Sequence, residues 1–166
     1  MSYYNIESKL TIFDLSSDLL KNYGSEKPVV VCLGSSKVLS DMVGVIVADI
    51  LRSRNVDVII FGGSKRNADK NMAKLIAKSL DKSRILFVDS GALSQKDSIM
   101  FASKLVLNDG AVIHSPCIVA GTITKQDSKY NFANIKLEEI KNYATVIADS
   151  ICSYFAYVDL LKTKPA

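Results

Sequence analysis

The 166-residue chain has little of what several classes of site require. Its three cysteines, Cys32, Cys117 and Cys152, are odd in number and widely spaced, and no CxxC pair occurs. This argues against a disulfide framework and against a structural zinc site built on cysteines, and it suits a reducing compartment. No GxxxxGK[ST] and no GxGxxG follows the first apolar run, so a nucleotide phosphate loop is not indicated.

Long apolar runs and basic clusters are also missing. No apolar run approaches the ~20 residues that span a bilayer, and the N-terminal MSYYNIESK lacks the basic-then-apolar plan of a signal peptide. The net charge is +4, but the densest basic group, Lys65, Arg66 and Lys70, is short and has no interleaved aromatics. We therefore expect a cytoplasmic protein with neither a membrane nor a nucleic acid as partner.

What is present is an α/β pattern in one domain, residues 1–166. The run Val29–Leu33 follows Pro28 and is apolar on both faces, which is typical of a central parallel strand. Helical spacing of apolar residues alternates with further apolar runs. The predicted order is strand 29–33, helix 41–53, strand 55–63, helix 66–80 and strand 83–91, with right-handed crossovers.

The remaining segments complete a three-layer α/β/α sandwich with a mostly parallel sheet and an antiparallel addition. Residues 1–13 are predicted to form a loose N-terminal arm, followed by a short helix that Asp14 caps and Gly24 ends. Two extended segments, 98–108 and 111–124, join at the turn Asn108–Asp109–Gly110. A polar loop at 124–134 and a long helix at 136–162 follow.

Two aspartates follow predicted strands and are the candidate chemistry. Asp41 comes after the loop Gly34–Ser40, and Asp89 follows the run ILFV. Parallel strands end at the same edge of a sheet, where ligands collect, so the two carboxylates meet if the first and third strands are neighbours. Two structural alternatives stay open: Asp41 as a helix cap, and Asp89 as a turn aspartate that bonds its own loop backbone.

A close carboxylate pair has a definite chemistry. The two carboxylates repel each other when both are ionised, so the pKa of one of them rises. That acid can hold a proton while the other activates water. The single histidine, His114, would complete an oxygen–nitrogen site for a divalent metal, although a structural histidine is the alternative. Cys117 lies three residues further along a strand, on the opposite face, which argues against a Cys–His dyad.

The stretch GSSKVLSDMVG, residues 34–44, resembles the loop of the YyaC-type sporulation proteins, which reads like G-T-D-R-x-x-G-D-x-L-G. In the same register it is similar to the spore germination protease and to the hydrogenase-maturation endopeptidases. Gly34, Asp41 and Gly44 match the shared positions, and the strand-end VDSG matches at Asp89. The chain departs from these families at Ser35, where the protease families usually have asparagine, and at Val45, where the sporulation and germination proteins have proline.

The resemblance implies a phosphorylase/hydrolase-like fold and a sporulation-associated peptidase in the cytoplasm, which for a sporulation protein can be that of the forespore. Carried over, Asp41 and Asp89 are the catalytic pair that hydrolyses a protein or peptide substrate, and we expect Gly34, Ser35 and Ser36 to bind that substrate. From the maturation endopeptidases comes a second expectation, nickel or zinc held by Asp41, Asp89 and His114. A non-catalytic sporulation factor and a homo-oligomer both stay open.

Overall fold

A computed structural model describes residues 1–124 and 135–163. The first half of the chain alternates strands and helices: β1 (Ser2–Asn5), α1 (Thr11–Tyr23), β2 (Val29–Cys32), the 3₁₀ turn η1 (Leu39–Asp41), α2 (Val43–Ser53), β3 (Ile60–Phe61) and α3 (Lys70–Ser79). The second half holds η2 (Lys82–Arg84), β4 (Ile85–Leu93), β5 (Ser98–Ala102), β6 (Leu105–Val106), β7 (Val112–Ile113), β8 (Cys117–Thr124) and α4 (Leu137–Lys162). The polar loop predicted over 124–134 lies, beyond Thr124, outside the described residues.

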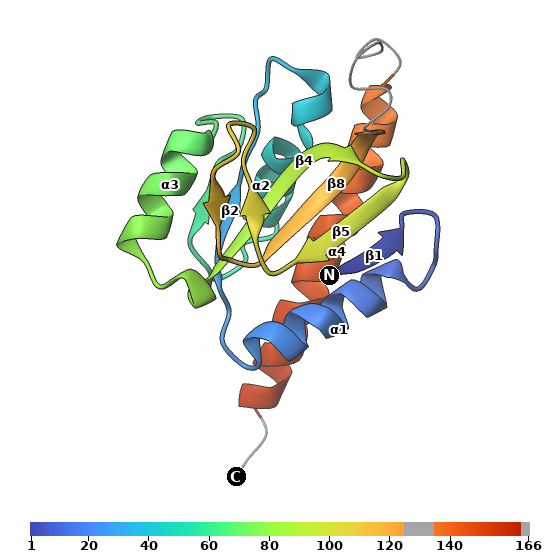
Figure 1. The fold of residues 1–166 in the computed structure, drawn as a ribbon. Coiled ribbons are helices and arrows are strands. Elements are labelled where there is room, and N and C mark those ends of the chain that lie inside the picture. Colours follow the sequence, from blue (N-terminus) through green and yellow to red (C-terminus); the bar gives the residue numbers. More distant parts are fainter. Residues whose placement is uncertain (125–134, 164–166) are drawn as a thin grey trace.

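Six strands form one sheet in the order β1-β5-β8-β4-β2-β3 (Figure 1). The four strands β3, β2, β4 and β8 run parallel, and β5 and β1 add antiparallel pairings at one side. A separate hairpin of β6 and β7 turns at residues 108–110. The predicted mostly parallel sheet with an antiparallel addition is confirmed. β2 and β4 are neighbours, which is the condition under which the two aspartates were expected to meet.

Helices cover the two faces of the sheet unequally (Figure 1). On one face, α1, α2 and α4 pack against Val30, Cys32, Leu86 and Val88 of the central strands. On the other face, the described elements are α3 and the β6–β7 hairpin, which bury the alternate strand residues, among them Phe87. The β-branched run of β2 is therefore buried on both sides, as its sequence predicts.

The long helix α4 belongs to the first of these layers. Among the described residues it alone is long and apolar enough to cross a membrane by length and composition. Its side chains Ile140, Ile147, Ile151 and Val158 are fully buried in the core that α1 and α2 share. The apolar content of α4 is thus used in packing against the sheet and its neighbouring helices.

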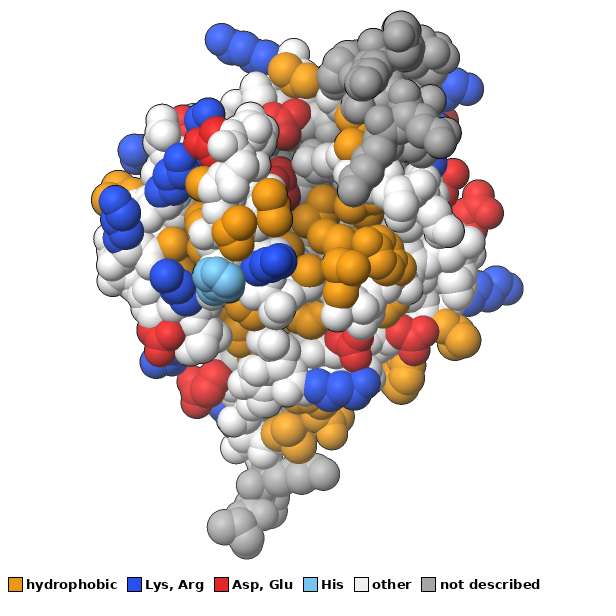
Figure 2. Space-filling model, viewed as in Figure 1, with side chains coloured by type: hydrophobic (Ala, Val, Ile, Leu, Met, Phe, Trp, Pro, Cys, Tyr) orange, Lys and Arg blue, Asp and Glu red, His pale blue; other side chains and the backbone are white. Residues whose placement is uncertain are grey.

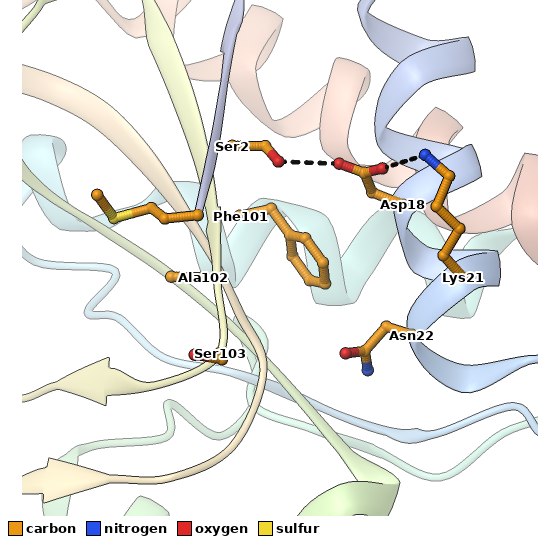
Figure 3. A pocket seen from close by; sticks show the side chains of 8 residues that line it. Ser2, Asp18, Lys21, Asn22, Phe101, Ala102 and Ser103 are labelled. Atoms are coloured by element: carbon orange, nitrogen blue, oxygen red, sulfur yellow. Dashed lines mark hydrogen bonds and ion pairs between the residues drawn. The ribbon is translucent and has the colours of Figure 1, made fainter.

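The prediction of a loose N-terminal arm is wrong. β1 pairs antiparallel with β5 at the edge of the sheet, and a carboxylate on α1 ties it down (Figure 3). Asp18 accepts hydrogen bonds from the hydroxyls of Ser2 and Tyr4, and it forms an ion pair with Lys21. Asp14 is not a cap, since α1 begins at Thr11 with Leu10 as its N-cap.

Candidate active site at the carboxyl ends of the strands

The loop between β2 and α2 folds back tightly on the end of β2. Gly34 has φ of 148°, and a Cβ there would lie 2.2 Å from the carbonyl oxygen of Asp41. The N–H of Ser35 donates to that same oxygen at 3.1 Å. A Cβ on Gly44 would lie 2.0 Å from the carbonyl oxygen of Leu33, so α2 begins in direct contact with the strand end. The glycines at these two positions are required for this close approach.

Asp41 is not the cap of α2. It is the last residue of η1, and the N-cap position of α2 is Met42, where no side chain bonds the helix N-terminus. The carboxylate is half-buried instead at the edge of the sheet. Burial raises the pKa of Asp41, and the nearby N–H of Ser35 opposes that change. The helix-cap alternative is therefore wrong, and Asp41 is held by packing rather than by capping.

Asp89 lies on the face of β4 that α3 and the hairpin partly cover, because its neighbour Val88 points into the opposite core. It stands at the level where β2 ends, since the N–H of Leu33 donates to the carbonyl oxygen of Val88. Burial, with a smaller contribution from the charge of Asp41, raises the pKa of Asp89 to about 7. β4 continues to Leu93, so Asp89 does not stand at a strand tip as predicted.

The turn-aspartate alternative for Asp89 holds in one respect. Its Oδ1 accepts a hydrogen bond from the N–H of Ser90 at 2.8 Å, which is a local bond to its own backbone. The bond lowers the pKa of Asp89, but burial outweighs it. A carboxyl that holds one oxygen fixed and keeps a raised pKa is well placed to carry a proton at neutral pH.

Both carboxylates line one cleft of about 310 Å³. The two aspartates are therefore brought together at the edge of the sheet, as predicted. One wall comes from the β2 loop and β4, and the other from the start of α3 and the tip of the hairpin. The lining residues are Leu33, Gly34, Ser35, Asp41, Asp89 and Ser90 on the first wall, and Ala68, Asp69, Lys70, Asn71, Leu107 and Asn108 on the second.

The second wall carries charged groups of both signs, which are paired with one another or with the helix N-terminus. Asp69 caps α3 by accepting a hydrogen bond from the N–H of Met72 at 2.9 Å, and the positive end of the helix dipole lies at the same place. Asp109 of the hairpin pairs with Lys74 at 2.6 Å and with Lys70 at 3.7 Å. These pairs, chiefly the bond from Lys74, hold the pKa of Asp109 at about 2 and fix the hairpin against α3.

The N–H groups of Ser35 and Ser36, two residues expected to bind the substrate, are already used in hydrogen bonds within the protein. The N–H of Ser35 bonds Asp41, and the N–H of Ser36 donates to Oδ1 of Asn67 at 3.0 Å. Ser36 is not among the residues that line the cleft. Ser35 does line it, and its Oγ accepts a bond from the N–H of Lys37 while keeping a proton that it can donate.

Asn67 does not line the cleft, but it holds the loop after β2 in place, and it was not among the residues predicted from the sequence. Its amide nitrogen donates to Oγ of Ser36 at 2.8 Å and to the carbonyl oxygen of Gly63 at 2.9 Å, so it links the loop after β2 to the loop after β3. The signal that could have found it is the one used for Asp41. Asn67 lies between a strand and the following helix, where parallel strands present their carboxyl ends.

His114 does not join the acid pair. It precedes β8, and the hydroxyl of the adjacent Ser115 donates to the carbonyl oxygen of Ile85, the first residue of β4, at 3.3 Å. Asp89 lies four residues further along β4, about 13 Å away at a strand rise of 3.3 Å per residue. The imidazole is exposed. In the described residues no three of His, Cys, Asp and Glu gather as metal ligands, so the predicted metal triad is not formed.

Cys117 is equally unsuited to be a nucleophile. It is fully buried, and its Sγ donates to the carbonyl oxygen of Lys104 at 3.1 Å. Burial raises the pKa of the Cys117 thiol to about 12, so the thiolate that would attack a substrate does not form at neutral pH. Of the candidate groups named from the sequence, the two aspartates and Ser35 share one cleft with Gly34.

Comparison with known proteins identifies a family for the chain but no activity. No curated protein matches the chain. Residues 1–150 match the family described as "Protein of unknown function (DUF1256)". The matched range includes the whole cleft, both aspartates and the whole six-stranded sheet. The chain is therefore a member of the DUF1256 family.

Proposed function

We propose that the protein is a peptidase that hydrolyses a peptide bond with Asp41 and Asp89. The observation that carries this proposal is that two carboxylates from different elements line one cleft and differ in environment. Asp41, on the loop wall, is the group that ionises and accepts a proton. Asp89, deeper and with a pKa of about 7, holds a proton that it can give.

The reaction follows from these two states. A water between the carboxylates attacks the carbonyl carbon of the substrate as Asp41 takes one of its protons. Asp89 gives its proton to the leaving nitrogen, the C–N bond breaks, and the products are a carboxylic acid and an amine. Ser35 Oγ, which lines the cleft, can donate a hydrogen bond to the carbonyl oxygen as negative charge develops on it.

The loop that carries Asp41 gives a second line of support. Its spacing of Gly34, Asp41 and Gly44 resembles that of the YyaC-type sporulation proteins and of the spore germination protease, in which two aspartates are thought to do the hydrolysis. We therefore propose that the substrate is a protein or peptide met during spore formation. A non-catalytic factor in the same process is the alternative that the following experiment distinguishes.

The test uses purified protein, a random peptide library and small acid-soluble spore proteins, in water enriched in ¹⁸O. Hydrolysis places one ¹⁸O in each new carboxyl group, which mass spectrometry detects. We expect Asp41→Asn and Asp89→Asn to abolish the labelled products, whereas Asp57→Asn, a change at an exposed carboxylate, leaves them unchanged. The rate falls as the pH rises through about 7, because Asp89 loses the proton that it donates.

Two results would overturn the proposal. One is that no substrate is cut between pH 5 and pH 8, which favours the non-catalytic factor. The other is cleavage that persists in both asparagine variants, which would assign the activity to other groups or to a contaminant.

A further inference from the structure

Among the elements that the structure describes, none covers one part of the sheet face that carries Asp89. On this face Phe87 of β4 and Cys117 of β8 are paired and fully buried beneath the hairpin. One step further along the same strands, Asp89 and Val119 are paired but only partly buried. The hairpin therefore covers the sheet at Phe87 and Cys117 but does not fully cover it at Asp89 and Val119. Figure 2 shows hydrophobic side chains gathered in this region, over β5 and β8.

The sheet register extends this level into a straight row of side chains. Asp89 pairs with Val119, Val119 with Met100 of β5, and Met100 with Tyr3 of β1. Directly paired residues point to the same face, so all four lie side by side on the open face. Val119 and Met100 are partly buried, and Tyr3 is 47% exposed. We call Val119, Met100 and Tyr3 the open row.

The dimensions of the open row fit one extended chain. Neighbouring strands lie about 4.8 Å apart, so the row runs about 14 Å from Asp89 to Tyr3, which equals about four residues of extended peptide. The hairpin borders the row on one side. On the other side the connection from β4 to β5 crosses the sheet, since a Cβ on Gly121 would lie 3.0 Å from the carbonyl oxygen of Gln95. The open surface between the hairpin and this connection extends from the level of Cys117 to that of Gly121, which is about 13 Å. It is too narrow to admit a second folded domain.

We propose that the open row binds the substrate of the acid pair as an extended segment with apolar side chains two and four residues from the cleaved bond. Alternate side chains of an extended chain point the same way and stand about 6.7 Å apart. Those at the second and fourth positions therefore come over the boundary of Val119 and Met100 and over Tyr3. The row holds no charged group beyond Asp89, so it selects apolar residues there. This inference rests on the proposed peptidase function, because the substrate positions are counted from the bond that the acid pair cleaves.

The test measures binding separately from cleavage. The probes are fluorescein-labelled peptides of about twelve residues in a Gly/Ser background that carry Leu-x-Leu, Leu-Leu or Ser-x-Ser. Fluorescence anisotropy with the Asp41→Asn/Asp89→Asn double variant gives their affinities. We expect Leu-x-Leu to bind about tenfold more tightly than the other two. In the wild-type protein, mass spectrometry should place the cut two residues from the leucine pair.

Variants then locate the binding surface. Tyr3→Ser and Met100→Ser should each remove the preference for Leu-x-Leu, and Tyr3, being half exposed, can change without loss of the fold. Phe13→Ser is the matched control, because Phe13 is 70% exposed on α1, which covers the opposite face. Circular dichroism melts confirm that each variant is folded.

The outcomes distinguish the two proposals. Binding that follows Leu-x-Leu without any cleavage supports the open row and removes the peptidase function. Cleavage without preference for the leucine pair supports the peptidase function and overturns the open row. Equal affinity for all three peptides overturns the open row, as does light scattering that shows a dimer abolished by Tyr3→Ser, which would make this face an interface between copies.

Discussion

The buried carboxyl of Asp89 should make the fold less stable as the pH rises, and replacing it with asparagine should remove this effect. The pKa of Asp89 rises from 3.8 to about 7 on folding, chiefly through burial. Between these two pH values the folded protein holds a proton that the unfolded chain has lost. Stability therefore falls with increasing pH across this window, and the loss is complete above pH 7.

The size of the effect follows from the same two values. They differ by about three pKa units, and each unit corresponds to about 1.4 kcal/mol, so ionised Asp89 lowers the free energy of unfolding by about 4 kcal/mol. Asp89→Asn keeps the shape of the protonated side chain and an oxygen for the N–H of Ser90. The variant should match the wild type near pH 3.5 and exceed it by about 4 kcal/mol at pH 8.

The assay is urea unfolding of both proteins from pH 3.5 to pH 8, with the difference between them plotted against pH. Taking the difference removes the contribution of groups whose pKa falls on folding, such as Asp109, because these are shared. Asp57→Asn, at an exposed carboxylate, is the control and should show no such rise. A difference that stays flat with pH, or that decreases, would refute the argument that Asp89 is buried beside Asp41.

Three further changes probe the site and its support. Asp41→Asn should lower the pKa of Asp89, while burial keeps that pKa above 3.8. Carboxyl ¹³C NMR measures the change, and an unchanged pKa would show that the two acids are too far apart to interact. Gly44→Ala should cost about 3 kcal/mol by overpacking, whereas Gly91→Ala, whose Cβ meets nothing nearer than 3.9 Å, should cost about 0.5 kcal/mol in the same unfolding assay. Asp18→Ala removes the acceptor of two β1 hydroxyls, so amide exchange in β1 should rise about 30-fold, for about 2 kcal/mol, and equal protection would show that strand pairing alone holds β1.

The central strands could be predicted because their signal is local. A β-branched run such as Val29–Cys32 is apolar on both faces, which identifies a strand covered on both sides. The short loops on either side of it place the strand next to its neighbours in the sheet. The position of Asp41 follows from the same reasoning, since it lies in the loop that leaves such a strand. The glycines on either side of it, Gly34 and Gly44, allow the close backbone approach that the structure shows at both positions.

The errors arise where a partner distant in the chain decides the structure. The segment Ser2–Asn5 carries no strong strand signal, and it becomes β1 because β5 and Asp18 both offer it partners. β4 continues past Gly91 because β8 pairs with it as far as Leu93. Neither partner is visible in the local sequence of the segment that it stabilises.

The misplacement of His114 has a different cause, and strand direction could have prevented it. Asp89 lies towards the carboxyl end of β4, whereas His114 precedes the first residue of β8. When two strands run parallel, the entry of one and the exit of the other are at opposite edges of the sheet. A parallel β8 therefore excludes His114 from the acid pair, and an antiparallel one would have allowed it. The sequence predicted an extended segment there but not its direction.

The register of β8 couples the acid pair to the open row. Asp89 and Val119 share a level only because Phe87 pairs with Cys117 two residues before. A slip of one residue would turn Val119 into the α4 core and bring Ile118 or Ala120 beside the acid, reversing every side chain of the strand. Ile118 and Ala120 are fully buried in that core, so the packing against α4 fixes the register. The core on one face thus determines which apolar groups a substrate meets on the other.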